Sequence, residues 1–596
     1  MSGLLMIGIA IVVLGGAYVI YGKWLANKWG IDPKAKTPAY AKEDGEDYIP
    51  APKAVVFAHQ FSSIAGAGPV TGPIIAAMFG WLPVLLWILV GGVFFGAVHD
   101  FGALYASVKN EGKSIGCIIE QYIGRTGKKL FLLFSWIFSA LVIAAFADIV
   151  TSTFNGFGAN GVKNTPNAAA ASISMLFIVV AVLFGLFVRY KKPSQLLEFV
   201  MGIILLLVML AVGISFPLYF SKNFWLVIVF AYIFLASITP MWLLMQPRDY
   251  LSSFLLIGMI VGAVLGVAVA RPSMNLAPFN GFVVNGKMLF PTLFVTIACG
   301  AVSGFHSLVS SGTSSKQVQN EKDMLSIGFG AMLVESLLAV IALVAVGSLA
   351  VGGKIPKGTP FSLFASAIAG FLGILGIPKY IAVCVMTMFV SALGLTTLDS
   401  VARIGRMSFQ EFFIDNTTDR SKMSPFKKLM TNNYFATIIT LAIGLALSFG
   451  GYNNVWPLFG SANQLLSALV LIALSVFLKT TGRKGFMLWG PMCIMLAVTF
   501  TALAQAIIGI VKKLSTGNFV FLTDGLQLIF AVLLAALGIM VTLSCFKKLL
   551  GKEEISAEKN GCIEIHSFHK KSRWSCLKTR LSAFIYMTLM YNKVNN

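Results

Sequence analysis

Long apolar runs separated by short polar connections occupy almost the whole of this sequence. A run of about 18 or more apolar residues has the length of a helix that crosses a lipid bilayer. The pattern therefore predicts an all-α polytopic membrane protein with about fifteen transmembrane helices. The predicted spans lie at approximately 3–21, 55–79, 81–104, 130–147, 170–188, 194–217, 223–245, 250–270, 289–308, 326–351, 378–397, 433–450, 457–478, 486–511 and 523–545.

A shorter apolar stretch at 361–377 contains glycine and is either a re-entrant segment or one further span. If it crossed the membrane, every later connection would change sides, and the basic residues of the C-terminal third would face outside. Basic residues favour cytoplasmic connections. We therefore predict that 361–377 is re-entrant.

Composition supports a membrane protein, because 57% of the residues are hydrophobic and 11% are charged, whereas soluble domains carry about 25% charged residues. The net charge of +22 would also suit a nucleic-acid-binding protein. Lys and Arg nevertheless concentrate in the short connections on one predicted side, as the positive-inside rule expects. We predict a multi-pass protein of the plasma (inner) membrane. Its predicted partner is the lipid bilayer, and we expect it to bind no nucleic acid.

The chain is predicted to hold one transmembrane domain at residues 1–545, with its N-terminus outside. Residues 22–54 mix charge with proline and are predicted to form an ordered cytoplasmic connector. Residues 546–596 are predicted to form a basic cytoplasmic tail, whose last part has the composition of a membrane-surface helix.

One predicted span, within residues 57–80, is interrupted near its middle. The residues that interrupt it are Gly66, Gly68, Pro69, Gly72 and Pro73. Each weakens or removes backbone hydrogen bonding, and hydrocarbon offers no water to replace it. Unwound backbone at membrane depth lines a cavity or lies within protein, where it can present N–H and C=O groups to a polar guest. The alternative is a kinked helix whose small residues allow close packing. The density of Gly and Pro favours a binding site.

A second interrupted element lies at 298–316 and runs in the opposite direction across the membrane. Two discontinuous helices of opposite direction predict an inverted-repeat transporter core. Six spans separate the two breaks, whereas the simplest scheme of five plus five spans requires four. Residues 239–247, in the stretch ITPMWLLMQPRDY, are therefore an alternative partner. The Ser-rich part of 298–316 could also be an ordinary cytoplasmic loop.

Small and hydroxyl-bearing residues at the two breaks are the predicted substrate contacts, together with one amide in the stretch FGSANQLLSAL. The predicted substrate-binding residues are Ser62, Ser63, Gly66, Gly68, Thr71, Gly300, Gly304, Ser307, Ser310 and Asn463. The Asn463 amide suits a hydrogen bond between helices equally well.

Ionisable residues inside a membrane are costly and are therefore functional candidates. The predicted proton-coupling residues are His59, His99, Asp100, His306 and Glu335. His99 and Asp100 are predicted near the cytoplasmic face, either as a proton gate or as a polar helix cap. Asp399 is predicted to pair with Arg403, one helical turn further on.

The motifs of common enzyme classes are absent from the sequence. It contains no Walker A pattern, no HExxH, no GxSxG elbow and no kinase motif set. Its seven Cys are scattered without paired spacing. We therefore predict a protein that is not an enzyme and needs no cofactor or bound metal.

Four stretches of the sequence resemble the carbon starvation protein A (CstA) family. They are GIDPKAKTPAYAKEDGEDYIPAPKAVVFAHQFSSIAGAGPVTGPIIAAMFGWLP, WILVGGVFFGAVHDFGAL, FHSLVSSGTSSKQ and TTLDSVARIGRMSFQEF. The resemblance covers nearly all of the chain to about residue 545. Where the family is expected to have paired histidines in the order GHHF, this chain has Ala58, His59, Gln60 and Phe61, so the second histidine is replaced by Gln60.

This resemblance implies an inner-membrane importer that is induced by nutrient limitation and has the discontinuous-helix core of the amino acid–polyamine–organocation transporters. It also implies uptake of peptides or, in some members, of pyruvate with protons. We therefore predict a secondary active transporter that imports peptides or a small carboxylate such as pyruvate, with protons as the coupling ion. A nutrient-state sensor or a channel is the alternative.

Overall fold

The computed structural model describes residues 2–158, 161–414, 423–449, 452–517, 519–520 and 524–550. The chain divides into a unit at Met1–Gly551, described below, and a second unit at Lys552–Asn596. The predicted tail at 546–596 therefore enters the described residues only as the end of the last helix. Its proposed membrane-surface helix lies outside them.

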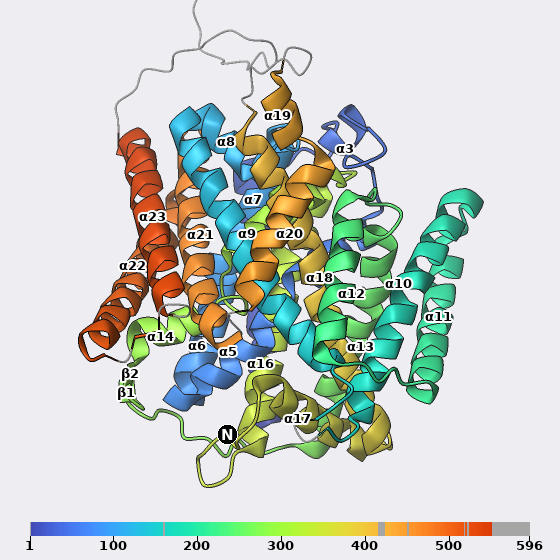
Figure 1. Cartoon of the computed structure of the whole chain (residues 1–596). Helices are drawn as coiled ribbons and strands as arrows, with labels where there is room; N and C mark the ends of the chain where they lie inside the picture. The colour runs from blue at the N-terminus through green and yellow to red at the C-terminus, as the bar shows by residue number, and fades with distance from the viewer. Residues whose placement is uncertain are drawn as a thin grey trace, which may run out of the picture. The chain divides into compact units, whose positions relative to one another are not determined.

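The first unit is built from helices, with one short two-stranded hairpin (Figure 1). In the first half of the chain the helices are α1 (Gly3–Ala17), α2 (Lys23–Trp29), α3 (Pro38–Ala41), α4 (Lys53–Ile64), α5 (Gly68–Ala76), α6 (Trp81–Gly91), α7 (Val98–Lys109), α8 (Ile115–Tyr122), α9 (Arg125–Phe154), α10 (Thr165–Lys191), α11 (Gln195–Ser215), α12 (Lys222–Ile238) and α13 (Met245–Ala270). The remaining elements are β1 (Val283–Val284), β2 (Lys287–Met288), α14 (Leu289–Thr296), α15 (Gly304–Gly312), α16 (Ala331–Leu349), α17 (Pro360–Ile374), α18 (Lys379–Phe412), α19 (Pro425–Met430), α20 (Asn433–Ser448), α21 (Tyr452–Thr480), α22 (Phe486–Ser515) and α23 (Leu526–Leu550).

Eleven helices among the described residues are long and apolar enough to cross a membrane, or twelve if the bent pair formed by α4 and α5 counts as one span. This confirms the predicted polytopic all-α class. The predicted number of about fifteen spans is not confirmed. The other predicted spans correspond to two shorter apolar helices, α12 and α20, and to the interrupted pair α14 and α15.

The same order of elements occurs twice in the first unit. A broken pair, α4 and α5, is followed by the long helix Trp81–Lys109, the short helix α8 and the long helix α9. The second broken pair, α14 and α15, is followed by the long helix Glu321–Leu349, the short helix α17 and the long helix α18. The two long helices that follow the breaks each contain a π-helical turn, Gly92–Ala97 in the first and Leu325–Gly330 in the second.

The two copies pack against one another in the middle of the unit. α9 and α18 make the most extensive contact between any two described elements. α7 packs on α15 and on the π-helical turn Leu325–Gly330, and α5 packs on α16. The fold is therefore an inverted-repeat transporter core with discontinuous helices.

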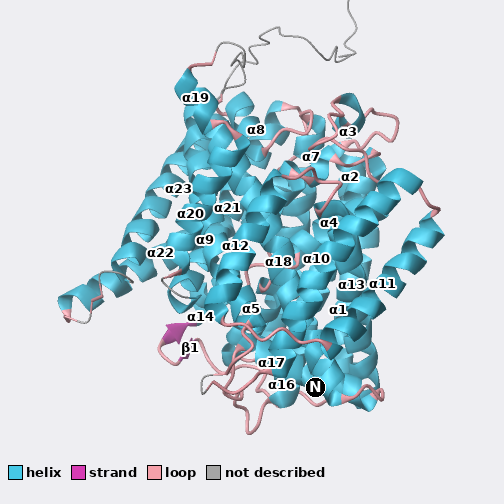
Figure 2. Ribbon diagram, turned by 45° about the vertical axis from the view of Figure 1, so that its right-hand side comes forward, coloured by secondary structure: helices cyan, strands magenta, loops and turns pink. Residues whose placement is uncertain are grey.

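Connections gather at the two ends of this unit. α3, α8 and α19 lie at one end, and α17 and the β1–β2 hairpin lie at the other (Figures 1 and 2). The predicted charge distribution assigns the end with α3, α8 and α19 to the cytoplasm. α17 has 15 residues, or about 22 Å of helix, which is shorter than the roughly 30 Å hydrocarbon core. That 361–377 is re-entrant stays a prediction.

Candidate functional site

The two broken helices meet at their breaks. α4 ends at Ile64, and Ala65 leaves the helical region with a ψ of 61°. α5 resumes at Gly68, where the absence of a Cβ allows close approach: a Cβ there would lie 2.4 Å from the Sγ of Cys299. A Cβ on Gly72 would lie 2.5 Å from the backbone oxygen of Thr296. The break in α4–α5 therefore faces the break in α14–α15, and the alternative partner at 239–247 does not fill this position.

The other predicted glycines also lie at close helix contacts. A Cβ on Gly66 would lie 2.8 Å from the Oγ1 of Thr397, and one on Gly300 would lie 2.7 Å from the Cβ of Ala339. A Cβ on Gly304 would meet α21 at 2.4 Å. Close packing, the alternative explanation of these glycines, is thus observed at their positions, and a role in substrate binding stays a prediction.

The predicted hydroxyl contacts are all buried and hydrogen-bonded within the protein. Their hydrogen bonds are Ser62 Oγ to the Asp249 carbonyl at 3.3 Å, Ser63 Oγ with Ser400 Oγ at 2.8 Å, Thr71 Oγ1 to the Ala67 carbonyl at 2.8 Å, Ser307 Oγ to the Gly304 carbonyl at 2.6 Å, and Gln60 Nε2 to Ser310 Oγ at 2.9 Å. A substrate that bound these hydroxyls would have to replace such bonds.

Asn463 is a structural contact of the second break. Its Oδ1 accepts from the backbone N–H of Phe305 at 3.0 Å and from Ser303 Oγ at 3.1 Å. Helix N-termini carry unpaired N–H groups, and the Asn463 amide satisfies one of them at the start of α15. The hydrogen bond between segments, one of the two predicted roles of Asn463, is observed, and a contact with the substrate stays a prediction.

The first of two buried ionic groups joins α4, α12, α13 and α18. We call it the Arg248 cluster; its members are His59, Tyr232, Arg248, Asp249 and Asp399. Asp249 Oδ2 accepts from His59 Nδ1 at 2.6 Å, and Asp249 Oδ1 accepts from Arg248 Nη2 at 2.6 Å. Arg248 also forms an ion pair with Asp399, whose Oδ2 accepts from the Tyr232 hydroxyl at 2.5 Å.

The Arg248 cluster contains a permanent cation. The Arg248 guanidinium pairs with both Asp249 and Asp399. His59 Nε2, on the far side of the imidazole from Asp249, contacts Thr313 Oγ1 at 2.8 Å. The two carboxylates are therefore held by a guanidinium, an imidazole and a tyrosine hydroxyl.

The second buried group joins α7, α15 and α16. We call it the Glu335 cluster; its members are His99, Asp100, His306 and Glu335. Asp100 accepts from His99 Nδ1 at 2.8 Å and from His306 Nδ1 at 2.9 Å. The Nε2 of His306 lies 3.4 Å from Glu335 Oε2, but neither atom has a hydrogen-bond partner. His99 Nε2 and Glu335 Oε1 also have none.

This second cluster contains no permanent cation. All four side chains are fully buried, and isolated buried charges cost several kcal/mol each. Two carboxylates are therefore balanced only by protons on the imidazoles and on Glu335, or by a bound cation. Cys299, His306 and Glu335 offer ligand atoms within 4.8 Å of one another and could together hold a metal ion, although the Cys299 thiol already contacts Ser303 and Asn463.

The structure brings the five predicted proton-coupling residues into these two clusters. His59 is in the Arg248 cluster, and the other four form the Glu335 cluster. His99 and Asp100 are fully buried, and their helix continues to Lys109, beyond its predicted end at residue 104.

The predicted pairing of Asp399 with Arg403 is wrong. Asp399 pairs with Arg248, and Arg403 Nη1 instead donates to Asp47 Oδ1 of the 22–54 connector at 3.0 Å. Spacing along one helix cannot reveal a stronger partner on another helix. The sequence prediction also missed Arg248 and Asp249, although two opposite charges beside a proline at a span boundary could have indicated them.

Comparison with known proteins gives the family. The model of the family described as carbon starvation protein CstA matches residues 2–355 and 350–502. The chain belongs to the CstA family. The peptide transporter CstA of Escherichia coli (strain K12) is 32% identical over 567 residues, which cover 82% of this chain and 78% of that protein. The peptide transporter CstA of Bacillus subtilis (strain 168) is 30% identical, over 82% of this chain and 87% of that protein.

A third relative in the CstA family is the pyruvate/proton symporter BtsT of Escherichia coli (strain K12), which is 31% identical over 79% of this chain and 76% of that protein. Among solved structures, a manganese transporter of Eremococcus coleocola in complex with an aromatic bis-isothiourea substituted compound has a TM-score of 0.50. It is 12% identical and covers 85% of this chain and 99% of that chain. This likeness concerns the fold. The CstA-family relatives are transporters and not enzymes, and this chain is a multi-pass protein of the plasma membrane.

Proposed function

We propose that this member of the CstA family imports a peptide or a small carboxylate together with protons, and that the Glu335 cluster carries the coupling proton. The observation that carries the proposal is the buried set of two carboxylates and two imidazoles without a permanent cation. The names of the relatives, peptide transporters and a pyruvate/proton symporter, support the cargo class. They do not favour the alternative of a sensor or a channel.

The geometry suits a proton that moves between His306 and Glu335. His306 Nδ1 donates to Asp100, which leaves Nε2 as the nitrogen that can take a proton. Glu335 Oε2 faces that nitrogen at 3.4 Å, close enough for a hydrogen bond after a small movement. Proton transfer between them would change the charge beside the break in α14–α15.

This position allows the proton and the cargo to affect one another. His306 belongs to α15, and Cys299, in the same break, packs on Gly68 at the start of α5. A movement that opens the facing breaks to the cargo would also alter the contact between α15 and α16. For a cargo without net charge, such as a zwitterionic peptide, one accompanying proton gains about 2.3 kcal/mol per 100 mV of membrane potential, enough for roughly fifty-fold accumulation. A monoanionic carboxylate that moves with one proton carries no net charge, so only the pH gradient drives its accumulation.

The test is uptake into vesicles that contain the purified chain, under an imposed pH gradient, with labelled pyruvate and labelled dialanine compared. We expect one of them to accumulate, and we expect a protonophore to abolish the accumulation. In Glu335→Gln, gradient-driven accumulation should fall about tenfold or more.

The matched control is Glu198→Gln, which removes a carboxylate from the partly exposed start of α11 and should leave uptake unchanged. If the gradient drives uptake of neither compound, the proposed function is wrong. If Glu335→Gln retains full gradient-driven uptake, the assignment of the Glu335 cluster is wrong.

A further inference from the structure

A charged cavity of about 720 Å³ lies between the 22–54 connector, the start of α20, α19 and the last turns of α18. It is at the end of the unit that holds α3 and α19 (Figure 1), which the charge distribution assigns to the cytoplasm. Small-molecule sites commonly have volumes of about 300–1,000 Å³. The cavity is therefore large enough for a dipeptide or tripeptide.

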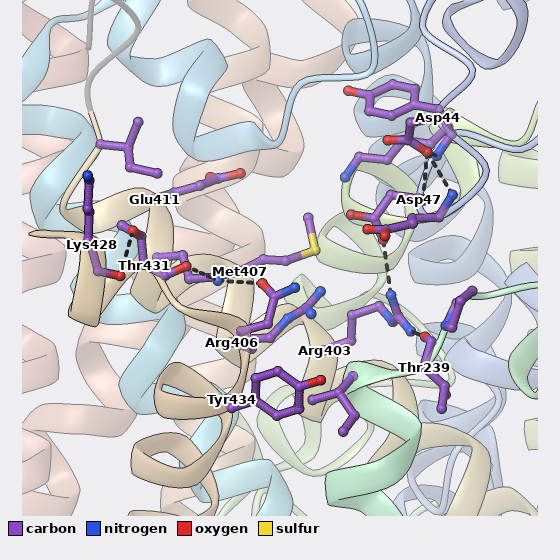
Figure 3. Close-up of a pocket in the computed structure, with 18 of the residues that line it drawn as sticks. Asp44, Asp47, Thr239, Arg403, Arg406, Met407, Glu411, Lys428, Thr431 and Tyr434 are labelled. Atoms are coloured by element: carbon purple, nitrogen blue, oxygen red, sulfur yellow. Dashed lines mark hydrogen bonds and ion pairs between the residues drawn. The ribbon is translucent and has the colours of Figure 1, made fainter. Parts of the chain in front are cut away.

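The inner part of the cavity contains a buried guanidinium that forms no hydrogen bond or ion pair with any described residue. Arg406 is 4% exposed, its Nε is buried without a hydrogen-bond partner, and it forms no ion pair among the described residues. The neighbouring Arg403, also buried, is already paired with Asp47. Figure 3 shows this difference, with a dashed line from Arg403 to Asp47 and none from Arg406.

Buried charges are normally paired, so the unpaired Arg406 indicates an anion that the described residues do not supply. The planar fork of a guanidinium binds a carboxylate through two parallel hydrogen bonds. A carboxylate at Arg406 would satisfy these donors.

The outer part of the cavity is acidic. Asp44 and Glu46 line it and are exposed, in contrast to Arg406. The lining as a whole has equal numbers of acidic and basic side chains. A guest with no net charge, an anionic end and a cationic end fits this arrangement better than a plain anion does.

The cavity also leads toward the second break. A small cavity beside it shares Met407 and Glu411 with it and is lined by Ser311 and Gly312 of α15. A guest in the large cavity would thus lie on the cytoplasmic side of the helix that carries His306.

We propose that this cavity is a binding site for a small zwitterion, with the carboxylate held by Arg406 and the ammonium group near the acidic residues Asp44 and Glu46. This inference rests on the proposed function in one respect, because it takes the guest to be the transported peptide. A peptide has both charged ends, whereas pyruvate has only the carboxylate.

The test is calorimetric titration of the purified full-length chain in detergent, without any gradient. The ligands are dialanine, dialanine amide, N-acetyl-dialanine and pyruvate. Dialanine should bind about tenfold or more tightly than dialanine amide, which lacks the carboxylate, and than pyruvate, which lacks the ammonium group. N-acetylation should weaken binding about threefold or more, since the acidic residues are exposed to solvent.

The variants are Arg406→Gln, Arg406→Lys and the control Lys427→Gln, which changes a partly exposed basic residue of α19 outside the cavity lining. Arg406→Gln should bind dialanine about tenfold or more weakly and should no longer distinguish the amide. The affinity of Arg406→Lys for dialanine should lie between those of Arg406→Gln and the unmodified chain, because lysine keeps the charge and loses the planar fork of the guanidinium. The control variant should bind dialanine as tightly as the unmodified chain does.

The proposal is overturned if Arg406→Gln binds dialanine like the unmodified chain, if amidation has no effect, if pyruvate binds as tightly as dialanine, or if no ligand binds at millimolar concentration. Comparing the ligands on the unmodified chain keeps the test valid even if a variant misfolds. Because binding needs no gradient, it can hold when vesicle uptake fails, and the two proposals can fail separately.

Discussion

The Arg248 cluster and the Glu335 cluster contain similar residues but differ in how their charges are balanced. In the Arg248 cluster, two carboxylates meet a guanidinium, an imidazole and a tyrosine hydroxyl, and Asp399 Oδ1 is its one atom without a partner among the described residues. In the Glu335 cluster, two carboxylates meet two imidazoles, and four side-chain atoms have no hydrogen-bond partner.

The difference suggests two different roles. A cluster that holds a permanent cation and is hydrogen-bonded almost completely within the protein suits a structural role, in which it holds its helices in one arrangement. A cluster without a permanent cation needs protons or another cation to balance its carboxylates. Incomplete pairing, and not burial alone, is therefore the reason why we propose the Glu335 cluster as the site of proton exchange.

Replacing the central cation of the Arg248 cluster should have the largest effect on stability. Arg248→Met leaves Asp249 and Asp399 buried with only His59 to balance them. Breaking a buried ion pair by removing one partner costs about 3–5 kcal/mol. Denaturant or thermal unfolding in detergent should show this loss, together with a lower yield of folded protein.

The control for Arg248→Met is Arg189→Met, because Arg189 lies over the Trp242 ring, with its guanidinium carbon 5.1 Å from the ring centroid, at an exposed helix end. That contact is worth about 0.5–1 kcal/mol. If both variants lose equally little stability, the Arg248 cluster does not hold the helices as described.

Replacing an ionisable side chain of the Glu335 cluster, in contrast, should not reduce the stability of the protein. Glu335→Gln removes a buried carboxyl group whose two oxygens have no partner. The free energy of unfolding should stay the same or rise by roughly 1 kcal/mol, while gradient-driven uptake is lost. Unfolding in detergent and vesicle uptake, measured on one preparation, would check both parts. A loss of stability as large as that in Arg248→Met would remove the distinction between the clusters.

A smaller effect is expected at Asp47, outside the membrane spans. Burial raises the pKa of Asp47, but the nearby cations Lys316, Arg403 and Arg406 outweigh burial and hold that pKa below its usual value. A lowered folded-state pKa means that the stabilisation is fully present above the unfolded pKa, about 3.9, and is lost as pH falls through the folded value.

Asp47→Asn should therefore reduce stability by roughly 1 kcal/mol at neutral pH and by less as pH falls below about 4. Thermal unfolding as a function of pH would measure this. The unmodified chain should lose stability in the acidic range more steeply than the variant. Parallel curves for the two proteins would contradict the role given to the Asp47–Arg403 pair.

The broken helix could be predicted from the sequence because its cause is local. Two Pro and three Gly within eight residues cannot support continuous helical hydrogen bonding, and α4 and α5 indeed form a pair bent by 42°. The sequence leaves two segments as possible partners of this break. The choice between them depends on which helices pack together, and no local pattern contains that information.

The predicted boundaries explain the residues that were missed. The apolar pattern places residues 246–249 in a connection between the predicted spans 223–245 and 250–270. In the structure, α13 begins at Met245 and buries Arg248 and Asp249 in its first turns. A shift of a few residues moved both charges from water into the protein. Glu335 could be predicted because it lies well within its apolar segment, and His306 could be predicted because it lies at a break. Their proximity required the fold.

The π-helical turns at Gly92–Ala97 and Leu325–Gly330 lie shortly before the two acidic residues of the Glu335 cluster, Asp100 and Glu335, on the same two long helices. Such a turn holds one residue more than an α-helical turn would. Deleting a single residue from Gly92–Ala97 would rotate the rest of that helix by about 100° and carry Asp100 away from His306, with no side chain of the site replaced. The geometry of the cluster is therefore encoded in the number of residues in these turns as much as in the identity of the acids that follow them.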